Sequence, residues 1–159
     1  AQSVPINITG IGVVGPGSPG LYEAGQIAVL KEHLEYVMDS VPWPNFKNPR
    51  TRAVADEYAK RSGGKTFDTN SGYSYDGMLI IADVLERAKS TDPDTIVDAI
   101  KKTRFTGNLM VSTGPVVFNE IGDNPNASTA LIQILGQKPV VVWPKEAAEQ
   151  KAVFPRPKR

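Results

Sequence analysis

Two stretches decide the fold, Gly114-Pro-Val-Val-Phe-Asn-Glu-Ile-Gly-Asp-Asn124 and Leu131-Ile-Gln-Ile-Leu-Gly-Gln-Lys-Pro-Val-Val-Val-Trp-Pro144. Both place β-branched residues between residues typical of turns, which is the pattern of short strands joined by hairpins. It predicts strands at Val116–Phe118, Ala130–Leu135 and Pro139–Trp143, with a tight turn at Gly136-Gln137.

Helices are predicted upstream of these strands. Asn48 and Asp92 each precede a proline, and this pair favours a helix start because Asx side chains cap free amides that proline does not need. The predicted helices are Pro49–Arg61, Tyr73–Lys89 and a third from Pro93 to near Thr103. Helices combined with strands in one chain predict an α/β fold.

The first part of the chain is rich in residues that break regular structure. A β-rich run, Val4–Ile8, precedes seven glycines and prolines between residues 10 and 20, which predicts a loop at the end of a strand. A short helix over Leu21–Leu30 and an exposed strand over His33–Met38 are expected next.

The pattern G-P-x-x-F-N-x-x-G-D at Gly114–Asp123, followed by G-x-x-V-x-V-x-P, resembles the end of one family. It is similar to the solute-binding component of ABC importers for branched-chain amino acids, and Ser74-Tyr75-Asp76-Gly77 extends the similarity. The resemblance implies a type I periplasmic binding protein fold, with two Rossmann-like lobes. It implies binding and no enzymatic activity.

The resemblance covers Val4 to Pro144 and corresponds to the C-terminal portion of the family's chain. It implies that residues 1–39 belong to lobe 2, residues 40–133 to the C-terminal part of lobe 1, and residues 134–159 to lobe 2 and a loose tail. Trp43 is expected where the chain crosses between lobes, or else in an exposed loop. Sheet edges left open by such a fragment predict that it pairs with the missing N-terminal half or with a swapped chain.

The resemblance also implies a ligand site. Its first segment is the loop Thr9, Gly10, Ile11 and Gly12, and its second contributes Asn70 and Tyr73. The first loop carries no carboxylate to pair with a ligand ammonium, which favours a ligand such as an aromatic carboxylate. Helix capping by Asn70 is the alternative to ligand contact.

Catalytic and metal sites have little support in the composition. The chain has no cysteine, a single histidine and a formal net charge of +1, so a thiolate or histidine-rich metal site and a nucleic-acid partner are not expected. Asp76 lacks a histidine or second carboxylate at a productive spacing, and we expect it in the first turn of a helix. No cofactor is expected.

The resemblance implies a periplasmic solute-binding component of an ABC importer. Such a protein captures an amino acid, or here rather an amino-acid-like or aromatic carboxylate, between its lobes and delivers it to a permease in the membrane. The alternatives are a ligand-sensing receptor domain of the same fold and a small α/β enzyme.

Overall fold

The computed structural model describes residues 13–15 and 22–157, which form two compact units. Unit 1 takes in the described residues up to Val41 and those from Ala130 onward, and unit 2 is Pro42–Thr129. The resemblance implied boundaries between lobes at residues 39/40 and 133/134. Those boundaries concern the two lobes of the family's fold and not the two units described here, so they stay a prediction.

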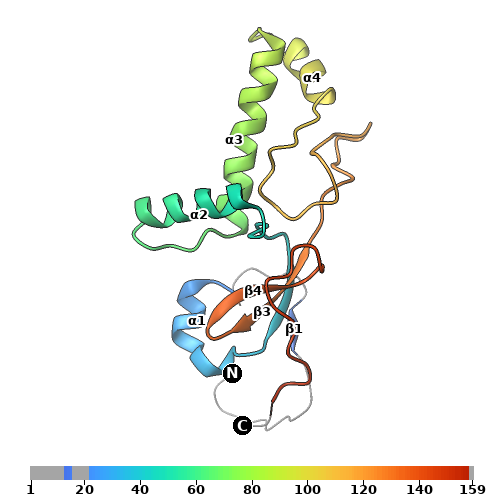
Figure 1. Ribbon diagram of the computed structural model, residues 1–159. Helices are drawn as coiled ribbons and strands as arrows, with labels where there is room; N and C mark the ends of the chain where they lie inside the picture. Colours follow the sequence, from blue (N-terminus) through green and yellow to red (C-terminus); the bar gives the residue numbers. More distant parts are fainter. Residues whose placement is uncertain (1–12, 16–21, 158–159) are drawn as a thin grey trace. The chain divides into compact units, whose positions relative to one another are not determined.

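Unit 1 is built on a four-stranded sheet in the order β1-β2-β3-β4 (Figure 1). β1 pairs with β2 in parallel, and the other two pairings are antiparallel. Its elements are β1 (Val14–Gly15), α1 (Ala24–Leu30), the 3-10 helix η1 (Lys31–His33), β2 (Met38–Val41), β3 (Ala130–Leu135) and β4 (Lys138–Trp143). The predicted strands at Ala130–Leu135 and Pro139–Trp143 are confirmed.

The β3–β4 hairpin turns where the sequence predicted. Gly136 and Gln137 have φ of 59° and 60°, as a two-residue type I′ turn requires. Their amides donate to the two carboxylate oxygens of Glu35, at 2.6 and 3.1 Å. A residue remote in sequence therefore fixes this turn.

The expected exposed strand over His33–Met38 is wrong. Leu34 and Val37 both point into a small apolar core with Ile27 and Ile134. Their three-residue spacing suits a helical turn, whereas in a strand they would face opposite sides of the sheet. The chain accordingly forms η1 and a turn, and the strand begins only at Met38.

A buried amide holds the end of the chain against unit 1. Gln133 on β3 is fully buried, and its Nε2 donates to the Tyr36 and Val153 carbonyls, both at 3.0 Å. Its Oε1 accepts from the Val153 amide at 2.9 Å. These bonds hold Val153, in the tail that was expected to be loose, to β3; residues 158 and 159 lie outside the described part.

Open edges were expected on the sheet, but the outer edge of β4 is partly covered. The Glu149 carboxylate accepts from the Val141 amide at 3.0 Å, and the Glu149 amide donates to the Val141 carbonyl at 2.8 Å. These bonds satisfy backbone groups that an edge strand would otherwise present to another chain.

Unit 2 is helical. Its helices are α2 (Pro49–Arg61), α3 (Thr69–Ala88) and α4 (Pro93–Lys101). Asn48 and Asp92 cap α2 and α4 as predicted, with Pro49 and Pro93 at the first helical positions. In the described residues of unit 2 no strand forms, and Val116, predicted in a strand, makes only an isolated bridge to Phe105.

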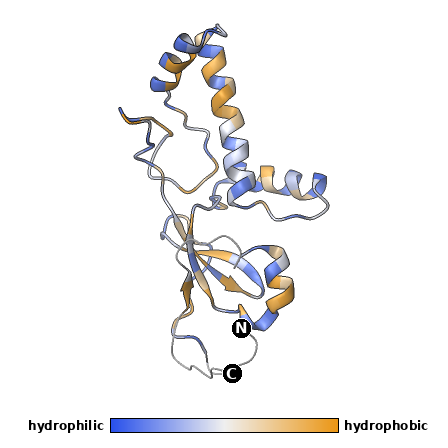
Figure 2. Ribbon diagram, turned by 180° about the vertical axis from the view of Figure 1, so that it is seen from behind, coloured by the Kyte–Doolittle hydropathy of each residue, from blue (hydrophilic) through white to orange (hydrophobic). Residues whose placement is uncertain are grey.

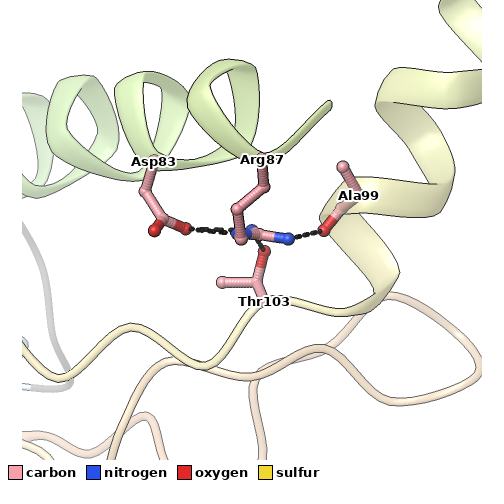
Figure 3. Close-up of polar contacts among 4 residues, drawn as sticks. All are labelled: Asp83, Arg87, Ala99 and Thr103. Atoms are coloured by element: carbon pink, nitrogen blue, oxygen red, sulfur yellow. Dashed lines mark hydrogen bonds and ion pairs between the residues drawn. The ribbon is translucent and has the colours of Figure 1, made fainter. Parts of the chain in front are cut away.

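Arg87 joins α3 to α4 (Figure 3). Its guanidinium donates to Asp83 one turn earlier, at 2.9 and 3.0 Å, and to the Ala99 carbonyl at 2.7 Å. A further bond at 3.1 Å reaches the Thr103 hydroxyl. The planar donor set of arginine matches these three acceptors and fixes the helical hairpin.

Trp43 follows β2 at the start of unit 2 and is only 1% exposed, so the exposed-loop alternative is wrong. Its carbonyl accepts from the Val111 amide at 2.8 Å. Among the described residues no helix is long and apolar enough to cross a membrane.

Candidate functional site

A groove of about 950 Å³ lies between α2 and the start of α3, wholly within unit 2. Its walls combine aromatic and aliphatic side chains with a polar rim. The lining residues are Arg50, Ala53, Val54, Glu57, Tyr58, Arg61, Phe67, Asp68, Asn70, Ser71, Ser74 and Tyr75.

Local sequence signals shape the two walls. α2 ends at Arg61, and Gly63 and Gly64 follow with φ of 72° and 90°, which reverses the chain toward α3. Asp68 then starts α3 through a capping box, because its carboxylate accepts from the Ser71 amide at 3.0 Å and the Ser71 hydroxyl accepts from the Asp68 amide at 2.7 Å.

Aromatic rings close the apolar end of the groove. Tyr58 on α2 and Phe67 before α3 meet edge to face with ring centroids 5.5 Å apart. Phe67 is 4% exposed, and Tyr75 on α3 is half-buried on the same lining. This end of the groove therefore offers a surface suited to an aromatic or branched aliphatic group.

The charged rim is partly neutralised. Arg61 donates to Glu57 at 2.7 Å, and this hydrogen bond holds the pKa of the Glu57 carboxyl below its usual value. In the described part of the chain the Arg50 guanidinium and the Asn70 amide make no side-chain hydrogen bond. These two groups are available to a carboxylate or amide of a ligand.

A buried carboxylate lies on the opposite side of α3. Both oxygens of Asp76 accept from the Leu109 amide at 2.9 Å, and Asp76 is 4% exposed. Burial raises the pKa of Asp76, opposed by backbone hydrogen bonds from Leu109 and Met110. The expected first-turn position is wrong, because α3 begins at Thr69; Asp76 instead anchors the loop that carries Leu109.

The structure describes only part of the predicted ligand site. Thr9, Gly10, Ile11 and Gly12 lie outside the described residues. Asn70 lines the groove and does not cap α3, a role that Asp68 takes.

The phenol of Tyr73 does not line the groove. Tyr73 is 48% exposed, and its pKa is raised by partial burial and by the Asp76 charge one turn away. Whether it or the other predicted residues contact a ligand stays a prediction.

The sequence interpretation missed the α2 side of the groove. Arg50, Val54, Glu57 and Arg61 recur at steps of three and four residues, which places them on one face of a helix. That spacing was a usable signal, but it resembles an ordinary solvated face. Tyr75 on α3 lines the groove as well.

Comparison with known proteins identifies the fold. A family model described as periplasmic binding protein matches residues 7–138. No curated protein matched the sequence.

Among solved structures, a leucine binding protein from Thermotoga maritima is 22% identical, with a TM-score of 0.61 over 74% of this chain and 33% of its own. A protein provisionally named a branched-chain amino acid ABC transporter, from Silicibacter pomeroyi, is 15% identical, with a TM-score of 0.68 over 95% of this chain and 41% of its own.

An extracellular ligand-binding receptor from Rhodopseudomonas palustris is 20% identical, with a TM-score of 0.53 over 77% of this chain and 38% of its own. The sequence thus spans less than half the length of these structures. The α/β architecture has the type I periplasmic binding fold, as the sequence predicted, and the chain belongs to the periplasmic binding protein family.

Proposed function

We propose that this chain acts in the periplasm as, or as part of, the solute-binding component of an ABC importer. It takes part in capturing a small molecule between two lobes and in delivering it to a permease in the membrane. The observation that carries the proposal is the family match over residues 7–138, with a fold like that of a leucine binding protein. Binding without bond chemistry is the expected activity.

The proposed ligand carries a carboxylate and an aromatic or branched apolar group. The segment Thr9-Gly10-Ile11-Gly12 contains no acid that would pair with an ammonium. In the groove, the Arg50 guanidinium suits a carboxylate, and the rings of Tyr58 and Phe67 suit the apolar group. A ligand without a free ammonium therefore needs no acidic partner from the segment Thr9-Gly10-Ile11-Gly12.

A thermal-shift screen of the natural polypeptide that carries this sequence tests the proposal. The probes are leucine, leucinamide and phenylacetate. A ligand present at one hundred times its Kd stabilises the native state by about 2.7 kcal/mol. Stabilisation by phenylacetate supports the proposed ligand class, stabilisation by leucine alone supports binding but contradicts that class, and no shift with a wider panel of solutes contradicts the binding function.

Matched variants locate the site. Arg50→Gln removes a positive charge that lines the groove and also lowers the pKa of Asp76, and Arg104→Gln makes the same change at an exposed position outside the groove. We expect the first variant to lose the ligand-induced shift and the second to keep it. Equal shifts in both variants place the carboxylate elsewhere.

A ligand-sensing receptor domain is the second candidate, since one of the similar folds is described as an extracellular ligand-binding receptor. The two functions share the binding step and differ in its consequence. Loss of solute uptake on deletion of the gene supports the importer component, whereas intact uptake with a lost response to the solute supports the receptor.

A further inference from the structure

Arg50 is the cation of the groove that suits the carboxylate of the proposed ligand, and it lies in the first turn of α2. Figure 2 shows hydrophilic residues on this helix around a short apolar stretch. Within the described residues no hydrogen bond fixes the guanidinium of Arg50. Contacts with neighbouring groups therefore determine where this charge lies.

One of those neighbours is Gly107, in the loop that follows α4. An ideal Cβ atom built on Gly107 would lie 2.7 Å from Nη1 of Arg50 and 2.8 Å from Cζ of Phe105. Both distances are far shorter than the roughly 3.5–4.0 Å of a favourable non-bonded contact. The guanidinium and the Phe105 ring thus occupy the space that a side chain at position 107 would take.

The backbone conformation of Gly107 does not explain why glycine is found there. Its φ lies outside the left-handed region that favours glycine, in contrast to the φ of Gly63 and Gly64 at the end of α2. Conformational freedom is therefore not what glycine supplies at position 107. It supplies space next to Arg50 and Phe105.

The loop around Gly107 is anchored on both sides. Phe105 exchanges two backbone hydrogen bonds with Val116, at 2.9 and 2.8 Å. Two residues after Gly107, the Leu109 amide donates to the Asp76 carboxylate at 2.9 Å. Because the backbone is held at both points, an added methyl group displaces the flexible tip of the arginine more readily than the loop.

Asp76 provides an electrostatic reason for the same placement of Arg50. Its carboxylate is 4% exposed on α3. Burial raises the pKa of Asp76, and the charge of Arg50 is among the interactions that oppose the rise. The attraction is mutual, so Asp76 draws the guanidinium toward the loop that its own hydrogen bond anchors.

We propose that Gly107 is a positioning residue of the candidate site and determines its preference for a carboxylate. Because position 107 has no side chain, the Arg50 guanidinium lies against this loop while it lines the groove. A larger residue there moves the charge away from the position in which a carboxylate meets it. The inference rests on the proposed function in one respect, since that function places the ligand carboxylate at Arg50.

Binding of phenylacetate and of its neutral analogue phenylacetamide tests the proposal. The two ligands share an aromatic ring, so the ratio of their Kd values isolates the contribution of the charge. Titration calorimetry measures this ratio in the unsubstituted protein, in Gly107→Ala, in Arg50→Gln and in the double variant. Gly77→Ala is the matched control, because an ideal Cβ atom at Gly77 meets nothing within 4 Å.

We expect the unsubstituted protein and Gly77→Ala to bind phenylacetate about tenfold or more tightly than phenylacetamide. Gly107→Ala and Arg50→Gln should each bring the ratio close to one without weakening phenylacetamide, and the double variant should lose no more than Arg50→Gln alone. A folded Gly107→Ala variant that keeps the preference overturns the proposal. Loss of cooperative unfolding in that variant also overturns it, because the methyl group then disrupts the loop and does not merely move Arg50.

Urea unfolding of the same proteins tests the contact without a ligand. Glutamine is shorter than arginine, so Gly107→Ala should be less unfavourable to stability in the Arg50→Gln background than in the unsubstituted protein. Equal effects in the two backgrounds overturn the inference. Failure of the unsubstituted protein to bind any solute contradicts the proposed function instead, so the two proposals can fail independently.

Discussion

The two units reach compactness by different means. Unit 1 has its own sheet, and polar side chains remote in sequence, Glu35, Gln133 and Glu149, satisfy its turn, its tail and its edge. Unit 2 buries Trp43 and Leu109 but leaves Met78, Ile81 and Leu85 on α3 exposed. The described backbone edges of unit 1 are thus met by polar side chains of the same unit, whereas one face of α3 in unit 2 is apolar and exposed.

The largest expected effect comes from the buried residues of each unit. Ile132→Ala in unit 1 and Leu109→Ala in unit 2 each remove a side chain that is at most 1% exposed, which costs about 2–5 kcal/mol. Trp143 and Trp43 report on units 1 and 2 respectively, so urea unfolding is followed by fluorescence in Trp43→Phe and Trp143→Phe backgrounds. Each substitution should shift mainly the transition of its own unit.

Leu85→Ala is the matched control for Leu109→Ala. Its side chain on α3 is 44% exposed, so the substitution should change the stability of the chain by less than about 0.5 kcal/mol. A cost equal to that of Leu109→Ala would show that this face of α3 is already buried and would remove the contrast between the units.

Gln133→Leu tests how unit 1 retains its tail. The substitution leaves the Tyr36 carbonyl and both backbone groups of Val153 without their side-chain partner, which costs about 1–3 kcal/mol. Trypsin should then cleave faster after Lys151. Gln150→Leu makes the same change at an exposed position and should leave cleavage unchanged; equal rates in the two variants contradict the anchoring role.

Arg87→Lys tests the junction of α3 with α4. Lysine cannot reach Asp83, the Ala99 carbonyl and Thr103 together, so we expect a loss of about 1 kcal/mol for this half-exposed group. Urea unfolding followed by Trp43 fluorescence measures it. Arg104→Lys at an exposed position should have no effect, and an equal loss there would contradict the geometry.

Asp76→Asn should change how stability depends on pH. Burial raises the pKa of Asp76 in the folded state, so ionisation costs stability as pH rises from the unfolded value of 3.8 through the folded pKa. This contribution is present in full below the unfolded pKa and is lost above the folded pKa. The free energy of unfolding is measured in urea between about pH 3 and pH 7. Its fall with rising pH due to Asp76 should appear in the unsubstituted protein and be absent from the variant.

Local signals in the sequence were sufficient for part of the fold. The caps at Asn48 and Asp92 and the turn at Gly136-Gln137 depend on neighbouring residues, and all three were predicted where they occur. The prediction of a strand at Val116–Phe118 was wrong. The residue types are typical of a strand, but Val116 makes only an isolated bridge to Phe105. The start of α3 was placed too late, since the cap is Asp68 and not a residue nearer Tyr73.

Contacts between distant residues could not be predicted. Gln133 reaches Val153, and Asp76 reaches Leu109 across 33 positions, and neither pairing has a pattern in the sequence. In the candidate site, Asn70 was predicted from the family resemblance and lies on the groove. Arg50 and Tyr58 were missed because their helical spacing also fits a solvated surface.

Isothermal titration calorimetry of the natural polypeptide tests the central claim, solute binding, most directly. The ligand is the solute that gives the largest thermal shift, titrated into the unsubstituted protein and into the Arg50→Gln and Arg104→Gln variants. The account predicts saturable binding of one ligand per polypeptide, weakened by Arg50→Gln and unchanged by Arg104→Gln. No saturable heat with any solute of the panel, in a protein whose cooperative unfolding shows it to be folded, would contradict it.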